Sequence, residues 1–71
     1  MMHYYPKLKL LRKDKDLTQK EVAAYLGTTQ QVYSKYEKGL QEIPLHHFVA
    51  LSELYGVSLD YLAAPPIDEQ K

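Results

Sequence analysis

The 71-residue sequence contains no cysteine, which excludes a disulfide framework and a thiolate metal site. No run approaches the roughly 20 apolar residues that a membrane-spanning helix needs. The first ten residues, MMHYYPKLKL, lack the apolar stretch of a secretory signal. No alternating apolar–polar run lies between hairpin signals, which disfavours strands. These absences predict an all-α protein that is soluble and cytoplasmic.

The charge is balanced overall but unevenly distributed. The formal net charge is zero, yet residues 1–39 carry a net charge of +4 and residues 40–71 a net charge of −4. One interpretation is scattered solvation of the surface. Another is a basic face for a polyanion, with the acidic part kept away from it.

Five helices are predicted, and they form one compact bundle over residues 1–64. The first helix begins near Pro6, which suits a first helical turn, and runs for roughly ten residues. After the last helix, Pro65–Pro66 prevents continuation. Residues 65–71 are therefore expected to form a disordered tail.

The second and third helices carry explicit start and stop signals. Thr18 and Glu21 have the spacing of a capping box, and Gly27 can take the left-handed conformation that ends a helix. Thr29 can cap a third helix that ends at Gly39. Because only about two residues separate these helices, they must diverge steeply, as in a helix-turn-helix.

The last two helices follow the same logic. Pro44 can begin the fourth helix and Gly56 can end it, while Ser58 caps a short final helix. Ser52 stands among the apolar positions of the fourth helix. Its hydroxyl group therefore needs a hydrogen-bond partner.

The third helix divides into two faces at about 100° per residue. Tyr33, Tyr36 and Val32 share an apolar sector, which predicts that the tyrosines anchor the helix to the core. The opposite sector is polar and consists of Gln31, Ser34, Lys35 and Lys38, with Gln30 at its border. A glutamine amide offers a donor and an acceptor together, which matches the edge of adenine in a DNA major groove.

The segment LTQKEVAAYLGTTQQVYSKYEKG resembles the helix-turn-helix core of the lambdoid phage repressor and Cro family, also called the XRE family. The downstream EIPLHHFVALSELYGVSLDYL resembles the fourth and fifth helices of these domains, so the resemblance covers roughly residues 7–63. It implies a lambda-repressor-like fold. It also implies a sequence-specific regulator of transcription, acting as a repressor on double-stranded DNA.

The resemblance also implies roles for individual residues. Gln30, Gln31 and Lys35 match base-reading positions, and Gln19 matches a residue that contacts a phosphate and braces Gln30. Thr29, Ser34 and Lys38 are expected to contact or support the DNA backbone, and Val32, at a position often polar in relatives, can offer apolar contact to a thymine methyl. Arg12 and Glu37 match a structural ion pair between the first and third helices. A homodimer on a palindromic operator follows from the same likeness.

Other interpretations remain open for several of these features. Gln30 and Gln31 could be a solvated helix face. The basic run Lys7–Lys15 is interpreted as a solvated helix surface, with contact to phosphates as the alternative. His46–His47 is interpreted as a solvated pair rather than a metal site, because adjacent helical residues point about 100° apart. Five tyrosines are interpreted as packing residues with solvated hydroxyl groups: Tyr25, Tyr33, Tyr36, Tyr55 and Tyr61.

No enzyme, cofactor or metal site is expected. The sequence has no Gly-rich phosphate loop and no arrangement of paired carboxylates or of Ser, His and Asp that would support catalysis. The rival function is a protein–protein interaction module, such as an antitoxin or anti-repressor component. It would use the same fold and its acidic, tyrosine-bearing C-terminal half.

Overall fold

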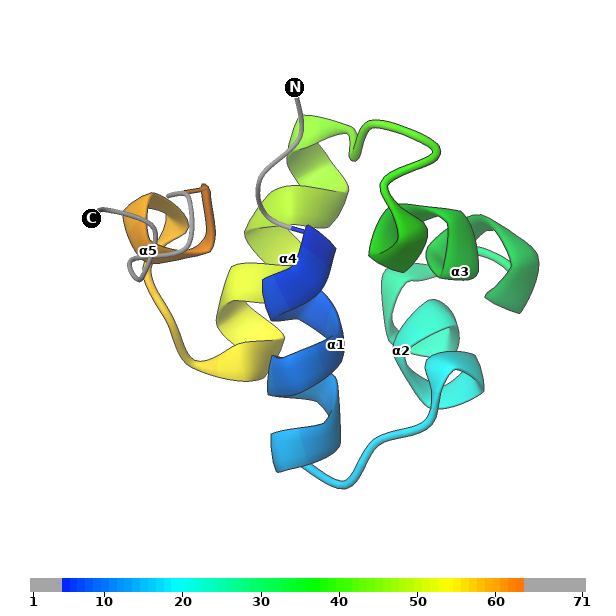
Figure 1. Ribbon diagram of the computed structural model, residues 1–71, viewed down its shortest axis with the longest axis horizontal. Helices are drawn as coiled ribbons and strands as arrows, with labels where there is room; N and C mark the ends of the chain where they lie inside the picture. Colours follow the sequence, from blue (N-terminus) through cyan, green and yellow to red (C-terminus); the bar gives the residue numbers. More distant parts are fainter. Residues whose placement is uncertain (1–4, 64–71) are drawn as a thin grey trace.

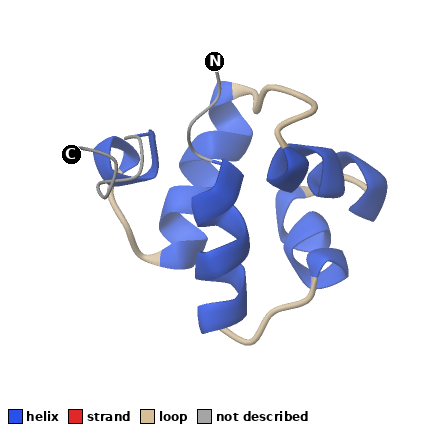
Figure 2. Ribbon diagram, viewed as in Figure 1, coloured by secondary structure: helices blue, strands red, loops and turns tan. Residues whose placement is uncertain are grey.

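The computed structural model describes residues 5–63, which form five α-helices and no strand (Figures 1 and 2). This confirms the predicted all-α, five-helix architecture. Residues 1–4 and the expected tail at 65–71 lie outside the described residues. The helices are α1 (Tyr5–Asp14), α2 (Gln19–Leu26), α3 (Gln30–Lys38), α4 (Leu45–Tyr55) and α5 (Leu59–Ala63).

One hydrophobic core joins all five helices. α3 packs against α1 and α2, and α5 packs against α4. Figure 1 shows α2 and α3 on one side of α4 and the short α5 on the other. Within the described residues no helix is long and apolar enough to cross a membrane. The buried apolar residues are Leu8, Val22, Ala23, Tyr33, Tyr36, Leu51, Tyr55 and Leu62.

The helix-turn-helix begins and ends at the predicted residues. Thr18 Oγ1 accepts a hydrogen bond from the Glu21 amide at 3.0 Å, and Glu21 Oε1 accepts one from the Thr18 amide at 2.8 Å. Gly27 ends α2 with a φ of 75°, in the left-handed region that glycine adopts without a steric penalty. Thr29 then caps α3 through its hydroxyl oxygen. α3 is thereby fixed at its N-terminus, close to where the two glutamines lie.

The link between α1 and α2 was not predicted in detail. Asp16 takes the left-handed conformation with a φ of 58°, which Asp tolerates better than most residues. The Leu17 amide donates to the Arg12 carbonyl at 3.1 Å and closes the end of α1. An aspartate thus has the role that glycine has after the other long helices.

The fourth and fifth helices follow the expected pattern. Pro44 precedes α4 and Gly56 follows it. Ser52, although buried, donates its hydroxyl hydrogen to the Val49 carbonyl at 2.7 Å, which supplies the partner that the sequence required. Ser58 Oγ accepts a hydrogen bond from the Tyr61 amide at 3.0 Å and caps α5.

The tyrosines do not all behave as predicted. Tyr25 and Tyr61 are 52% and 51% exposed, so they lie at the surface and outside the buried core. Tyr61 instead lies under the Lys7 ammonium, 4.5 Å from the ring centroid. Tyr33 and Tyr55 are buried, but their hydroxyl groups bond to each other at 2.8 Å rather than to solvent. Tyr25 and Tyr61 therefore lie at the surface. Tyr33 and Tyr55 form a polar contact inside the core.

Candidate nucleic-acid interface

α3 presents two chemically different faces. Tyr33 and Tyr36 are 0% and 1% exposed, whereas Gln30 and Gln31 are exposed to solvent. The rings of the two tyrosines meet edge to face with centroids 6.2 Å apart. The helix is thus anchored by its aromatic face, and its amides project outward, as the periodicity predicts.

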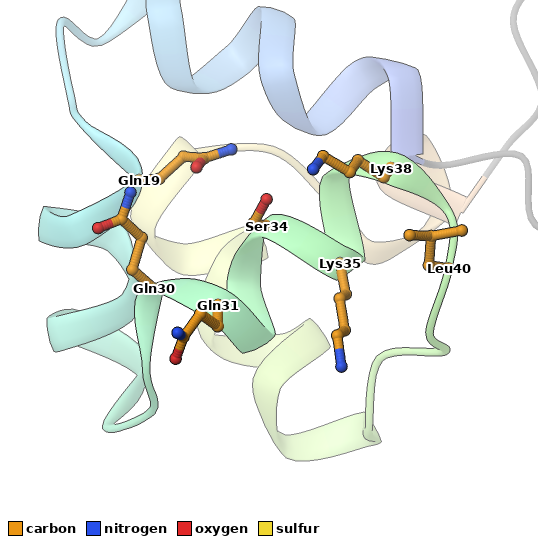
Figure 3. A pocket seen from close by; sticks show the side chains of 7 residues that line it. All are labelled: Gln19, Gln30, Gln31, Ser34, Lys35, Lys38 and Leu40. Carbon is orange, nitrogen blue, oxygen red and sulfur yellow. The ribbon is translucent and has the colours of Figure 1, made fainter.

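The exposed face of α3 borders an open hollow (Figure 3). Its lining includes two lysines and no acidic side chain, so the hollow suits an anionic ligand. Figure 3 shows side chains from α2, from α3 and from the segment after α3 on one surface. The lining residues are Gln19, Gln30, Gln31, Ser34, Lys35, Lys38 and Leu40.

The structure brings together six of the eight residues predicted to contact DNA. Thr29 does not line the hollow, and its hydroxyl oxygen caps α3 by accepting a hydrogen bond from the Val32 amide at 3.2 Å. Val32 is half-buried and packs against the hydrophobic core. Sequence reasoning missed Leu40, because it stopped at the end of the polar helix face. The available signal was a large apolar residue directly after the predicted C-terminal Gly39.

A buried ion pair ties α1 to the end of α3. Arg12 Nε lies 2.5 Å from Glu37 Oε2, and Arg12 Nη2 donates to Glu37 Oε1 at 3.1 Å. Arg12 also donates to the Leu17 carbonyl at 3.0 Å. The pair expected from the resemblance is present, with two parallel N–H···O bonds, the geometry for which a guanidinium is suited.

Gln19 joins this network from α2. Its Nε2 donates to Glu37 Oε1 at 3.0 Å, while its side chain also lines the hollow beside Gln30. One amide hydrogen is therefore committed to the protein interior. The second hydrogen and the carbonyl oxygen are not used by this bond, so Gln19 connects the ion pair to the exposed surface.

The network shifts the ionisation of its members. Burial tends to raise the pKa of Glu37, but hydrogen bonds from Arg12, Gln19 and Tyr33 outweigh it, and the pKa lies below the ordinary value. The hydrogen bond to Glu37 correspondingly raises the pKa of Arg12. Burial and the hydrogen bond to Tyr55 raise the pKa of Tyr33, and burial raises that of Tyr55 to about 12. The Arg12–Glu37 pair is therefore charged at physiological pH. The side chains of Tyr33 and Tyr55 are neutral.

The two adjacent histidines lie in different environments. His46 is exposed, as predicted, but the prediction of full solvation is wrong for His47, whose Nδ1 lies 2.9 Å from the Tyr36 hydroxyl. Burial and the neighbouring His46 lower the pKa of His47. The contact ties α4 to α3. Among the described residues, no group of three or more His, Cys, Asp or Glu side chains could hold a metal ion.

The fold and this surface together define a helix-turn-helix domain. Its second helix, α3, has one exposed polar face. A family model described as helix-turn-helix matches residues 8–62. The chain belongs to this family, in which the XRE-type domains are found.

Curated relatives match most of the chain. It is 44% identical over 55 residues to the uncharacterized HTH-type transcriptional regulator YqaE of Bacillus subtilis (strain 168), covering 78% of this chain and 47% of that protein. It is 38% identical over 58 residues to the cryptic phage CTXphi transcriptional repressor RstR of Vibrio cholerae, covering 82% and 52%. The chain thus spans about half the length of the curated relatives it matches.

Solved structures share the fold. The P22 c2 repressor, crystallised with a synthetic operator, superimposes with a TM-score of 0.83 at 21% identity, covering 93% of this chain and 100% of that one. A chain of the SinR protein/SinI protein complex gives a TM-score of 0.74 at 26% identity, covering 94% and 62%. The lambda-repressor-like fold predicted from the sequence is therefore confirmed.

Proposed function

We propose that this chain is a sequence-specific double-stranded DNA-binding regulator of transcription, acting as a repressor in the cytoplasm of a bacterium. The observation that carries the proposal is the division of α3 into a buried tyrosine face and an exposed face of amides and lysines. Relatives bear the names of transcriptional regulators and of a repressor, and the P22 c2 neighbour was crystallised with operator DNA. The regulator and repressor names of these relatives agree with an exposed face that is suited to DNA.

In this proposal α3 enters the major groove. Gln30 and Gln31 lie in its first turn, the part of a recognition helix that contacts base edges. Their amides suit adenine, and Lys35 suits the acceptors of guanine. The three side chains lie on one exposed surface, which supports their joint role (Figure 3).

The remaining residues support the DNA backbone. Lys38 and Ser34 line the same hollow and would contact phosphates. Gln19 would donate its second amide hydrogen to a phosphate while Glu37 holds the first. Thr29 acts mainly as the helix cap, and Val32 would reach a thymine methyl only from the edge of the core.

Useful affinity requires two copies of the chain. A single short helix buries little surface, and two-fold symmetric partners bind half-sites about 34–36 Å apart. We assign a homodimer on a palindromic operator, with its contact at α5 and at the part of the loop after Gly39 that leads into α4. Leu45, just beyond the loop, is 73% exposed and Tyr61 on α5 is 51% exposed, so both can be covered by a partner.

Binding to a random-sequence duplex at increasing salt tests the proposal. A DNA-binding domain loses affinity steeply, with a log–log slope of about −0.9 per neutralised phosphate. If the purified protein binds no duplex even near 50 mM salt, where phosphate contacts are weakly screened, the proposal fails. The interaction module would then be the better function, and a partner protein should be sought for the acidic half.

A further inference from the structure

Leu40 is an apolar side chain in an otherwise polar hollow. It is 70% exposed, and the other six lining residues are amides, lysines and a serine. Figure 3 shows it beside Lys35 and Lys38, at the opposite end of the surface from Gln30. Its position among the polar residues of this surface, and not its exposure alone, distinguishes Leu40 from a solvated leucine such as Leu10.

The backbone holds Leu40 in place. Gly39 takes the left-handed conformation with a φ of 74°, and the Leu40 amide donates to the Lys35 carbonyl at 2.9 Å. A hydrophobic residue at this point of a helix end often packs against the side chains of the last turns. Here those positions are Ser34 and Lys35, which are both polar. The backbone at Leu40 is thus held by a hydrogen bond, and the two helix positions that usually receive its side chain are polar.

We propose that Leu40 contacts the 5-methyl group of a thymine and acts as a specificity-determining residue. The inference rests on the proposed function. The thymine methyl is the apolar group that base edges present in the major groove. Gln31 and Lys35, which line the same hollow, would place those edges next to Leu40. The assignment differs from the one made for Val32, which is partly buried against the core and does not line the hollow.

Replacement of thymine by deoxyuridine isolates this contact, because the two bases differ only in the 5-methyl group. The duplex is first selected from a random pool by the unaltered protein, and each thymine is then replaced in turn. Three proteins are compared: the unaltered chain, Leu40→Ala, and Leu10→Ala as a matched control. Leu10 is 68% exposed on α1, outside the hollow.

When uracil replaces one particular thymine of each half-site, the unaltered protein should lose about fourfold in affinity. This is the loss expected when the burial of one methyl group is removed. Leu40→Ala should bind thymine and uracil equally at that position, whereas Leu10→Ala should retain the discrimination. Val32→Ala should retain the discrimination at this thymine as well, because Val32 does not line the hollow.

Three results would overturn the inference. The unaltered protein could tolerate uracil at every position, or Leu40→Ala could keep the full discrimination. Alternatively, Leu40→Ala could weaken self-association in sedimentation with an unchanged thymine pattern, which would place Leu40 in the dimer contact. Absence of binding to any duplex is a separate outcome, since it would remove the proposed function itself.

Discussion

Arg12 on α1 and Glu37 near the end of α3 are 25 positions apart in the sequence and form a buried, doubly hydrogen-bonded ion pair. Arg12 is 9% exposed and Glu37 is 8% exposed. The same carboxylate accepts from Gln19, which lines the candidate DNA surface. The pair therefore links the orientation of α3 to that of the helices behind it.

Removal of one partner of this pair should destabilise the fold strongly. We expect Arg12→Met to lower the free energy of unfolding by about 3–5 kcal/mol, because it leaves an unpaired carboxylate in the interior. Urea denaturation followed by circular dichroism measures this loss. Lys9→Met, on an exposed position of the same helix, is the control and should cost little. The double variant Arg12→Met/Glu37→Met should be more stable than Arg12→Met alone; an equally unstable double variant would show that the charge was not the cause.

The low pKa of Glu37 predicts a loss of stability in acid. A carboxylate with a pKa below its unfolded value stabilises the fold above that unfolded value, and the stabilisation disappears as the pH falls through the folded pKa. The free energy of unfolding should therefore fall as the pH is lowered from about 5. Glu37→Gln should be less stable at neutral pH but should show a shallower decline. Parallel declines in the two proteins would assign the acid sensitivity to other groups.

The buried tyrosine pair predicts a loss of stability in alkali. The pKa of Tyr55 is raised to about 12 and that of Tyr33 is also raised, so folding favours their neutral forms. The stabilisation is complete below the unfolded value of about 10 and is lost as the pH rises toward the folded value. Denaturation at about pH 8 and about pH 11 should show a smaller difference for Tyr55→Phe than for the unaltered protein. Tyr25→Phe, at an exposed position, should show the full difference.

Lys38 is expected to bind a phosphate rather than a base. Lys38→Ala should weaken binding equally on all duplex sequences and reduce the magnitude of the log–log salt slope by about 1. Lys9→Ala, on an exposed position of α1 outside the hollow, should leave the slope unchanged. Equal slopes for Lys38→Ala and the unaltered protein would remove Lys38 from the interface.

Much of the fold could be predicted from local chemistry. Thr18, Glu21 and Gly27 fix helix ends through contacts within a few residues, so their pattern is legible in the sequence. Asp16 was missed because a left-handed aspartate gives a weaker signal than glycine. The large exposure of Tyr25 and Tyr61 could not be predicted, because a tyrosine suits both core and surface, and tertiary packing decides between them.

The candidate site was only partly predictable. The helical period placed Gln31, Lys35 and Lys38 on one face, and the structure retains that face. The bond from Gln19 to Glu37 joins residues on different helices, so no local pattern reveals it. Leu40 lies beyond the helix, where the period no longer applies. Its place in the hollow depends on the left-handed turn at Gly39.

The most direct test of the account is selection of bound sites from random duplexes by the unaltered protein and by Gln31→Ala. The account predicts a symmetric site, and a loss of preference at one base position of each half-site that corresponds to about 1–3 kcal/mol. Lys38→Ala, run in parallel, should weaken binding without changing the preferred sequence. A uniform loss of affinity for Gln31→Ala, with every base preference intact, would contradict the claim that the exposed face of α3 reads DNA sequence.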